Sequence, residues 1–312
     1  MSRLIPLAIT DDNSVVSDLR GGSVAIGNFD GAHRGHAHLI AALTQQAQKV
    51  GGPAIVITFD PPPIALLKPD RKLGNPLTTL ERRSELLGKL GVDAVVVLRT
   101  TTELLSLSPE AFFYQTIVEA LAARAMAEGP NFRFGAQRRG DTKMLAELCR
   151  DSGITLQIVE GQTRGDQLIS STRIRQLITA GNVAAAGAML TAPYEISGQV
   201  TTGAKRGRDL GFPTANLADI PVLLPANGVY AGTTEIDDQS YRVAVNIGSN
   251  PTFDDASTKV EAHVLDWDGD LYGRHLKVCL HERIRDVKRF DSLGDLKRQI
   301  AADIQRCRSQ SQ

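Results

Sequence analysis

The sequence is short of cysteine, aromatic residues and long apolar runs, and it carries no excess of charge of either sign. Only three of its 312 residues are cysteine, at Cys149, Cys279 and Cys307. Three widely separated cysteines cannot build a disulfide framework, and they lack the CxxC spacing of a zinc site. We therefore expect a reducing, cytoplasmic environment.

The absence of long apolar runs and of net charge argues against membrane and nucleic-acid partners. No run approaches the ~20 apolar residues that a membrane-spanning helix needs. The opening MSRLIPLAITDDNSVV, with Pro6 in a short apolar run followed by acids, does not resemble a signal peptide. The 35 basic and 35 acidic residues cancel, so no overall field attracts nucleic acid or a membrane. We expect small-molecule substrates, with no nucleic-acid or membrane partner.

Up to about residue 190, short apolar runs alternate with segments of helical pattern. The apolar runs cover 23–27, 54–60, 93–98 and 154–160, and the helical segments cover 35–50, 78–91, 108–123 and 170–181. Continuous β-branched runs are typical of strands buried on both faces, and the helices between them supply the crossovers of a parallel sheet. This pattern predicts a doubly wound α/β domain, assigned to residues 1–190.

Beyond Tyr194 the pattern changes to short strands. The strand-like segments cover 195–202, 228–236, 241–248, 259–267 and 275–284, with Gly, Pro, Asn and Asp between them. Short strands without helical crossovers indicate an antiparallel barrel or sandwich. An amphipathic segment at 292–307 predicts a terminal helix. We assign residues 191–312 to this second domain.

The stretch GNFDGAHRGH directly follows the first predicted strand. Ligands of an open parallel sheet bind beyond the carboxyl ends of its strands. Gly27 and Gly31 allow a ligand to approach the backbone, and the next helix offers its amides and positive dipole end to a phosphate. His33 and His36, one helical turn apart, can face the same side and donate to phosphate oxygens. A zinc site with Asp30 and a purely structural histidine pair are the alternatives, and we favour phosphate binding.

Three further segments are expected at the same sheet edge. TFDPPP ends the second strand, GPNFRFG follows another apolar stretch, and ISSTRIR opens a helix. The second segment brings Asn131, Phe132 and Phe134 towards the crevice. The hydroxyls of the third can cap a helix or hold a phosphate. SST alone is more often a helix cap. It indicates a phosphate site here only because the histidine motif is also present.

GNFDGAHRGH with ISSTRIR resembles the HxGH nucleotidyltransferase superfamily. With TFDP, LTTLERR and NFRFG in this order, the N-terminal half resembles the FMN adenylyltransferase module of bacterial bifunctional FAD synthetases. The resemblance implies transfer of the adenylyl group of ATP to FMN, giving FAD and pyrophosphate. It implies that His33 and His36 contact the ATP phosphates as catalytic residues. The residues that it places around the substrates are Gly27, Phe29, Asp30, Gly31, Asn131, Ser170, Ser171, Thr172 and Arg175.

A second glycine-rich stretch, TTGAKRGRDLGFPTANL, lies in the C-terminal half. Its candidate cofactor-binding residues are Gly203, Lys205, Arg208 and Gly211. No GK[ST] is present, so this is not a Walker loop, and an exposed basic hairpin would explain the glycines and charges alone. If PTAN is extended, Thr214 and Asn216 point two neutral oxygens the same way. Magnesium prefers such hard oxygen ligands.

The segment VEAHVLDWDGDLYG offers two candidates for the proton acceptor that a kinase needs. Glu261 and His263 alternate with apolar residues, so they share one face of a predicted strand. A plain solvent-facing position is the alternative for both. The sequence alone does not separate these two candidate bases.

GRDLGFPTAN, GVYAG, NIGSNPTF, VEAHVLD, DGDLYG and RFDSLGDL occur in the order seen in riboflavin kinases. The resemblance implies a six-stranded antiparallel barrel with a terminal helix. It implies that Thr214 and Asn216 lie at magnesium and the ATP phosphates. Glu261 would be the general base for the ribityl 5′-hydroxyl of riboflavin, and residues 246–253 would be a loop that closes over the substrates.

Together the two resemblances predict a bifunctional enzyme that uses ATP and magnesium to convert riboflavin to FMN and FMN to FAD. One alternative is a riboflavin kinase with a non-catalytic, nucleotide-binding N-terminal domain. A non-enzymatic flavin or nucleotide sensor is another, and a transferase that uses CTP and a different acceptor is a third. The presence of both sets of motif residues favours the bifunctional enzyme.

Overall fold

The computed structural model describes residues 2–7, 17–70, 74–202, 207, 211–250 and 255–309. The chain folds as two compact units. The first comprises Met1–Gly74 and Thr78–Ser170, and the second comprises Asn75–Leu77 and Ser171–Gln312. The division into two functional domains at residues 190 and 191 stays a prediction.

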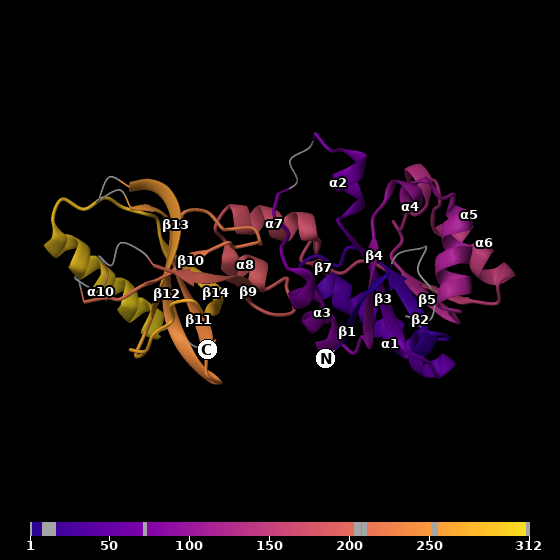
Figure 1. Ribbon diagram of the computed structural model, residues 1–312, viewed down its shortest axis with the longest axis horizontal. Helices are drawn as coiled ribbons and strands as arrows, with labels where there is room; N and C mark the ends of the chain where they lie inside the picture. Colours follow the sequence, from indigo (N-terminus) through magenta and orange to yellow (C-terminus); the bar gives the residue numbers. More distant parts are fainter. Residues whose placement is uncertain are drawn as a thin grey trace. The chain divides into compact units, whose positions relative to one another are not determined.

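The first unit is built on a six-stranded parallel sheet in the order β1-β4-β3-β2-β5-β6 (Figure 1). Its strands are β1 (Arg3–Leu7), β2 (Ser23–Ile26), β3 (Ala54–Asp60), β4 (Ala94–Arg99), β5 (Ala125–Glu128) and β6 (Thr155–Ile158). From β2 the chain builds outward through β3 and β4, and it then returns to the other side of β2 for β5 and β6. The gap between β2 and β5 is therefore the switch point at which open α/β sheets bind ligands.

Helices cover both faces of this sheet. They are α1 (Arg34–Val50), α2 (Pro63–Leu67), α3 (Leu80–Lys89), α4 (Thr102–Ser106), α5 (Pro109–Phe112), the π-helix η2 (Phe113–Ala120), the 3-10 turn η3 (Ala136–Arg138) and α6 (Thr142–Asp151). Leu43 of α1 packs in one core with Val56 of β3. Phe113 of η2 packs in the opposite core with Ile57 of β3. Burial on both faces confirms the doubly wound architecture predicted from the continuous apolar strands.

Local sequence explains where α1 begins and ends. His33 caps its N-terminus, and Gly51 ends it in the left-handed region at φ 68°, a conformation that glycine adopts without a steric penalty. Ile40, Leu43 and Ala47 recur at helical spacing and are buried. Because they anchor α1 against the sheet, the helix holds its first turn at the carboxyl end of β2.

The second unit is a closed antiparallel barrel in the order β10-β13-β12-β11-β14-β9. Its strands are β9 (Tyr194–Thr201), β10 (Ala215–Ala218), β11 (Gly228–Ile236), β12 (Gln239–Asn250), β13 (Asp255–Val264) and β14 (His275–Arg285). The strand β10 contains part of PTAN, which the hydrophobic pattern alone did not reveal as a strand. The six-stranded barrel that the family resemblance implied is confirmed.

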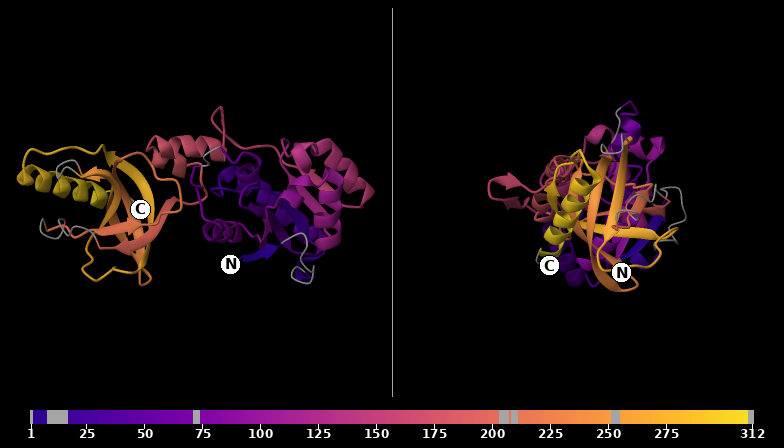
Figure 2. Two further views of the ribbon diagram at one scale, coloured as in Figure 1. Left: turned by 45° about the horizontal axis from the view of Figure 1, so that its top comes forward. Right: turned by 90° about the vertical axis from the view of Figure 1, so that its left-hand side faces the viewer.

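The terminal helix α10 (Leu293–Ser309) lies along the outside of the barrel and is seen in yellow in Figure 2. Ile304 and Cys307 of α10 pack against Val229 and other apolar residues of the barrel wall. Arg285 on β14 forms a bidentate ion pair with the buried Asp303 of α10, with its Nη2 2.7 Å from Oδ2. Paired hydrogen bonds of this kind fix geometry as well as charge, so the helix is held in one register.

Two short helices that lie between the sheet and the barrel in the sequence fold with the second unit. They are α7 (Ser171–Thr179) and α8 (Val183–Gly187). The turn between them passes close to the barrel, because a Cβ added at Gly181 would lie only 2.9 Å from the Tyr230 hydroxyl oxygen. The segment 75–77 also belongs to the second unit. Arg175 Nη1 donates to the Asn75 carbonyl at 2.5 Å, and Leu223 N donates to the Pro76 carbonyl at 2.8 Å.

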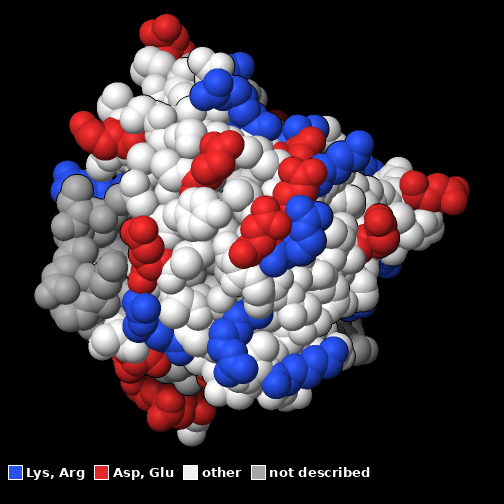
Figure 3. Space-filling view, turned by 90° about the vertical axis from the view of Figure 1, so that its right-hand side faces the viewer, with Lys and Arg blue, Asp and Glu red and all other residues white. Residues whose placement is uncertain are grey.

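Small elements and surface charge complete the description. The hairpin β7 (Thr163–Arg164) and β8 (Gln167–Leu168) follows β6. On the face of the first unit seen in Figure 3, acidic and basic side chains are interspersed. Among the described residues, no helix is both long enough and apolar enough to cross a bilayer.

Candidate active sites

The turn between β2 and α1 leaves the sheet edge through an unusual backbone. Phe29, Gly31 and Ala32 all have positive φ, at 48°, 83° and 40°. Positive φ is costly for residues with a side chain, and such strain gathers at ligand-binding turns. The Gly27 amide is still part of the sheet, since it donates to the Ile57 carbonyl at 2.9 Å. The turn therefore starts from a rigid strand and delivers His33 to the head of α1.

His33 and His36 cap α1 reciprocally. The His36 amide donates to His33 Nδ1 at 3.2 Å, and the His33 amide donates to His36 Nδ1 at 3.3 Å. The two rings stack with centroids 3.5 Å apart. Because a backbone N–H can only donate, both Nδ1 atoms are acceptors, and each neutral ring carries its proton on Nε2. The structural role and the phosphate role are therefore compatible, because they use different ring nitrogens.

Burial keeps both imidazoles uncharged. It lowers the pKa of His33 to about 4, against a smaller opposing effect of Asp30. It also lowers the pKa of His36 well below the usual range, and the neighbouring His33 and Arg83 charges act in the same direction. At neutral pH the pair thus offers Nε2–H donors without a positive charge.

Asp30 fastens the turn to the start of α3. Its Oδ1 accepts from the Thr78 amide at 3.1 Å and lies 3.4 Å from Nη2 of the buried Arg83. Thr78 Oγ1 in turn accepts from the Gly31 amide at 3.1 Å. These contacts give Asp30 a clear structural task, and its expected role in nucleotide binding stays a prediction.

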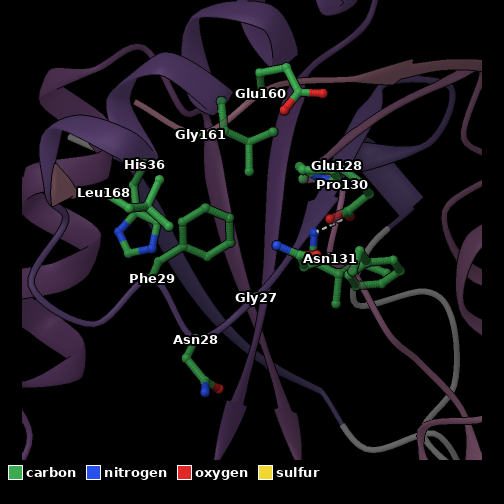
Figure 4. A pocket seen from close by; sticks show the side chains of 14 residues that line it. Gly27, Asn28, Phe29, His36, Glu128, Pro130, Asn131, Glu160, Gly161 and Leu168 are labelled. Atoms are coloured by element: carbon green, nitrogen blue, oxygen red, sulfur yellow. Dashed lines mark hydrogen bonds between the residues drawn. The ribbon is translucent and has the colours of Figure 1, made fainter. Parts of the chain in front are cut away.

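A pocket of about 420 Å³ opens at the switch point (Figure 4). Its walls come from the turn after β2, the start of α1, the segments after β5 and β6, and β8. The lining residues are Ile26, Gly27, Asn28, Phe29, His36, Leu39, Glu128, Gly129, Pro130, Asn131, Phe132, Glu160, Gly161 and Leu168. In Figure 4 the Phe29 ring lies beside the His36 imidazole, with Glu128 and Asn131 on the opposite side. This pocket combines apolar walls with a few polar groups, as small-molecule sites do.

Several residues predicted from the sequence line this pocket, and others lie elsewhere. Gly27, Phe29, His36 and Asn131 line it. His33 is buried directly behind His36, and its ring stacks on that of His36. Phe132 lines the pocket too, whereas Phe134 is buried in the sheet core and stacks on Phe132, with ring centroids 5.5 Å apart.

Glu128 was not predicted from the sequence, although it lies in the pocket wall. It is the last residue of β5 and only 1% exposed, and its Oε1 accepts from the Ile26 amide at 2.7 Å. Burial raises the pKa of Glu128 well above the usual carboxyl range. Burial also raises the pKa of the nearby Cys149 thiol of α6 to about 12, with a smaller contribution from the Glu128 charge. An acid at the end of an otherwise apolar run was the available signal.

The ISSTRIR motif begins beside the head of α1. A Cβ at Gly35 would lie 3.3 Å from the Ile169 carbonyl oxygen, so this carbonyl passes close to the helix start. Ser171, Thr172 and Arg175 belong to α7, which folds with the second unit. Their contact with the same phosphates as the histidines, and that of Ser170, stays a prediction.

In the barrel, strand register aligns the predicted kinase residues. Glu261 on β13 is paired with Asn216 on β10 and with Asn246 on β12. Directly paired residues of antiparallel strands lie on the same face of the sheet. Ala215 and Leu217 are buried while Thr214 and Asn216 are half-buried, which puts both predicted magnesium ligands on that outer face. Asn246 was expected in a closing loop, but it lies within β12.

His263 shares the face of Glu261, as predicted, but it has a different task. Its Nδ1 lies 2.7 Å from the Pro213 carbonyl oxygen, and its ring meets the Phe212 ring edge-on at 6.0 Å. A carbonyl oxygen only accepts, so His263 must donate from Nδ1. This contact ties β13 to the PTAN segment and leaves Glu261 as the stronger candidate base.

Part of the second motif is outside the described residues. Gly203, Lys205 and Arg208 fall there, as do residues 251–254 of the expected loop. Gly211 is exposed with φ 88°, which suits a turn that only glycine makes easily. In the part of the chain that is described, no three His, Cys, Asp or Glu side chains gather as a metal site, so nothing there supports the zinc alternative.

Comparison with known proteins decides the family. A model of FAD synthetase matches residues 15–173, and a model of riboflavin kinase matches residues 190–311. The bifunctional riboflavin kinase/FMN adenylyltransferase of Escherichia coli (strain K12) is 37% identical over 281 residues and is covered to 90%, as is this chain. The protein of the same name from Pseudomonas fluorescens is 36% identical, with 93% of each chain covered. This chain belongs to the bifunctional riboflavin kinase/FMN adenylyltransferase family.

Membership confirms the main prediction over the kinase-only alternative, because both domains of the family are present. ATP, FMN and FAD fit this family as substrates and products. A solved structure from Streptococcus pneumoniae, named a macrolide-efflux protein, has the same fold, with a TM-score of 0.89 and 32% identity over 99% of both chains. Its name describes that protein alone.

Proposed function

We propose that the pocket beside His36 holds ATP for adenylyl transfer to FMN, and that Glu261 activates riboflavin for phosphorylation on the barrel. The observation that carries the first half is the 420 Å³ pocket at the switch point, with a neutral histidine donor in its wall. The second half is supported by the alignment of Glu261 with Asn216 across paired strands. Both halves agree with the chemistry of the family.

In the first unit, an oxygen of the FMN phosphate attacks the α-phosphorus of ATP, and pyrophosphate leaves. No protein nucleophile is needed, so the protein contributes position and charge stabilisation. Nε2–H of His36 donates to a phosphate oxygen while negative charge builds on it, and the positive end of the α1 dipole acts in the same direction. His33 positions the His36 ring by stacking and capping. Asn131 seats a substrate in the opposite wall.

In the second unit, the Glu261 carboxylate accepts the proton of the ribityl 5′-hydroxyl, and that oxygen attacks the γ-phosphorus of ATP. FMN forms and ADP leaves. Thr214 and Asn216 fit a magnesium ion, since both offer neutral oxygen atoms on one face beside Glu261. Magnesium neutralises charge on the ATP phosphates when it is bound. The cytoplasm is the proposed compartment, because all three cysteines are free thiols.

Two substitutions test the assignment on the intact chain. We expect His36→Ala to lower FAD formation from added FMN about a hundredfold, the size of effect seen when one transition-state donor is lost, while riboflavin phosphorylation continues. We expect Glu261→Gln to lower FMN formation by at least a hundredfold while FAD formation from added FMN continues. Chromatography of the flavins after incubation with ATP and magnesium measures both rates.

The matched controls are an exposed histidine on the same helix and an exposed acid on the same barrel. His38→Ala and Glu235→Gln remove such side chains from α1 and β11, and both should leave the two rates within about twofold of the parent, as surface changes usually do. Normal FAD formation by His36→Ala would overturn the phosphate role of His36. Normal FMN formation by Glu261→Gln would overturn its role as base.

A further inference from the structure

Glu128 occupies the place where β2 and β5 separate. The two strands pair at Ser23 with Ala125 and at Val24 with Met126. At Ile26 the amide bonds to the Glu128 side chain instead of the backbone of β5. The carboxyl group therefore fills the opening between the strands, and it forms part of the pocket wall (Figure 4).

A buried carboxyl group at this position needs an explanation. Glu128 is 1% exposed, and no lysine or arginine of the described ranges pairs with it. Burying a carboxylate without a cation is costly, and burial accordingly raises the pKa of Glu128 well above its usual range. This shift favours the neutral carboxylic acid over the carboxylate. Because Oε1 accepts from the Ile26 amide, the proton lies on Oε2, which makes it a hydrogen-bond donor.

The other walls of the pocket indicate which part of a ligand lies against the Glu128 donor. Phosphates belong at the head of α1, beside His36. The remaining walls are largely apolar and come from Leu39, Pro130, Phe132 and Leu168. Such walls suit a flat heterocycle, whose ring nitrogens are hydrogen-bond acceptors. A neutral donor suits this position better than a carboxylate, which would repel the nearby phosphates.

We propose that Glu128 is a specificity-determining residue of the adenylyltransferase site, and that its carboxylic acid donates a hydrogen bond to a ring nitrogen of the adenine of ATP. This inference rests on the proposed function of the pocket. It goes further by assigning base recognition to a residue of this chain's own wall. A neutral hydrogen-bond donor that selects a ring acceptor rejects analogues in which that nitrogen is replaced by C–H.

The test measures KM for ATP and for 1-deaza-, 3-deaza- and 7-deaza-ATP in FAD formation from added FMN. We expect one of the three analogues to raise KM about tenfold in the parent protein, with kcat within about threefold, because a binding interaction is lost. In Glu128→Leu, KM for ATP should rise by a similar factor, and the same analogue should then cost nothing further. If Glu128 had a purely structural role, the effects of the analogue and of Glu128→Leu on KM would simply add.

Two variants and one internal activity keep the result interpretable. Glu128→Gln keeps an acceptor for the Ile26 amide and a donor towards the pocket, so its KM for ATP should stay within about threefold of the parent. Glu147→Gln on the exposed face of α6 is the matched carboxyl control, and it should change nothing. Riboflavin phosphorylation by each variant shows that the second unit is intact.

Three outcomes overturn the inference. One is an equal KM for ATP and all three analogues in the parent protein, a measurement that does not depend on any variant folding. The second is an analogue penalty that persists unchanged in Glu128→Leu. The third is a Glu128→Gln variant as impaired as Glu128→Leu. In all three cases FAD is still made and the proposed function stands, whereas failure of the parent chain to make any FAD would overturn that function itself.

Discussion

At the scale of single residues, the first site depends on side chains that burial keeps uncharged. The neutral states of His33, His36 and Glu128 have one cause, which is the removal of these groups from water at the edge of the sheet. The uncharged rings donate from Nε2, and the uncharged acid donates from Oε2. In the proposed function, these residues of the first unit therefore act on the substrates as hydrogen-bond donors rather than as fixed positive charges.

The histidine pair gives a testable titration. Burial lowers the pKa of His33 from its usual 6.5 to about 4. Between these two pH values the unfolded chain binds a proton at His33 and the folded protein does not. Stability of the first unit is thus complete above pH 6.5 and falls as the pH drops towards 4. Imidazole NMR signals of His33 and His36, assigned by substitution, should show no titration between pH 6 and 8. A midpoint near 6.5 for either ring would contradict this account.

The buried acid predicts the opposite pH dependence. Above its usual value of 4.5, the unfolded chain releases the Glu128 proton while the folded protein retains it. Each pH unit between that value and the raised pKa then costs about 1.4 kcal/mol of stability. Glu128→Gln should therefore be more stable than the parent at pH 7 and equal to it near pH 4. Urea unfolding of the first unit across this range measures the difference, and a constant difference would contradict it.

At the scale of elements, strand register is what assembles the kinase residues. Glu261 faces Asn216 and Asn246 because β13 pairs with β10 on one side and β12 on the other. His263 then links β13 to the Pro213 carbonyl, which precedes β10. A side chain outside PTAN thus adds to the strand pairing that already holds this segment in the barrel.

This link predicts a binding effect rather than a catalytic one. His263→Phe removes the hydrogen bond to Pro213 while keeping a ring against Phe212. We expect KM for magnesium-ATP in riboflavin phosphorylation to rise about fivefold, which corresponds to one hydrogen bond of about 1 kcal/mol. The value of kcat should stay within about threefold. A hundredfold fall in kcat with unchanged KM would instead make His263 the base.

Sequence patterns predicted those parts of the sites that depend on local periodicity. The common face of Thr214 and Asn216, and that of Glu261 and His263, follows from strand alternation. Pairings between distant strands leave no such local trace, so the sequence did not show that Asn246 lies in register with Glu261. The burial of Phe134 depended likewise on tertiary packing.

Contacts formed by a side chain across the sheet were also missed. Glu128 caps the end of β2, about a hundred residues earlier in the chain. Asp30 was predicted as a nucleotide contact, and the structure adds an ion pair with Arg83 that its position in the motif did not reveal. The partners of both carboxyl groups are fixed only by the fold, so motif spacing can identify such a residue but not its contact.

At the scale of the whole molecule, two units each carry one proposed chemistry. The parallel sheet positions the histidines and the pocket, while the barrel positions Glu261 and the PTAN oxygens. If each unit works through its own residues, FMN released by one molecule is a competent substrate for another. Mixing Glu261→Gln with His36→Ala should then restore FAD formation from riboflavin, with a lag while FMN accumulates.

Flavin chromatography over time measures that complementation. Each variant alone should make at most a trace of FAD from riboflavin, and the mixture should approach the parent rate once free FMN has built up. The failure of the mixture to make FAD, although FMN accumulates and added FMN is consumed by Glu261→Gln, would contradict independent action of the units.

One time course tests whether this single chain makes FMN and then FAD at separate sites. The purified chain is incubated with riboflavin, ATP and magnesium, and the flavins are separated by chromatography. We expect FMN first and FAD after it, with pyrophosphate formed in step with FAD. Accumulation of FMN without FAD would contradict the adenylyltransferase site, and unchanged riboflavin with conversion of added FMN would contradict the kinase site.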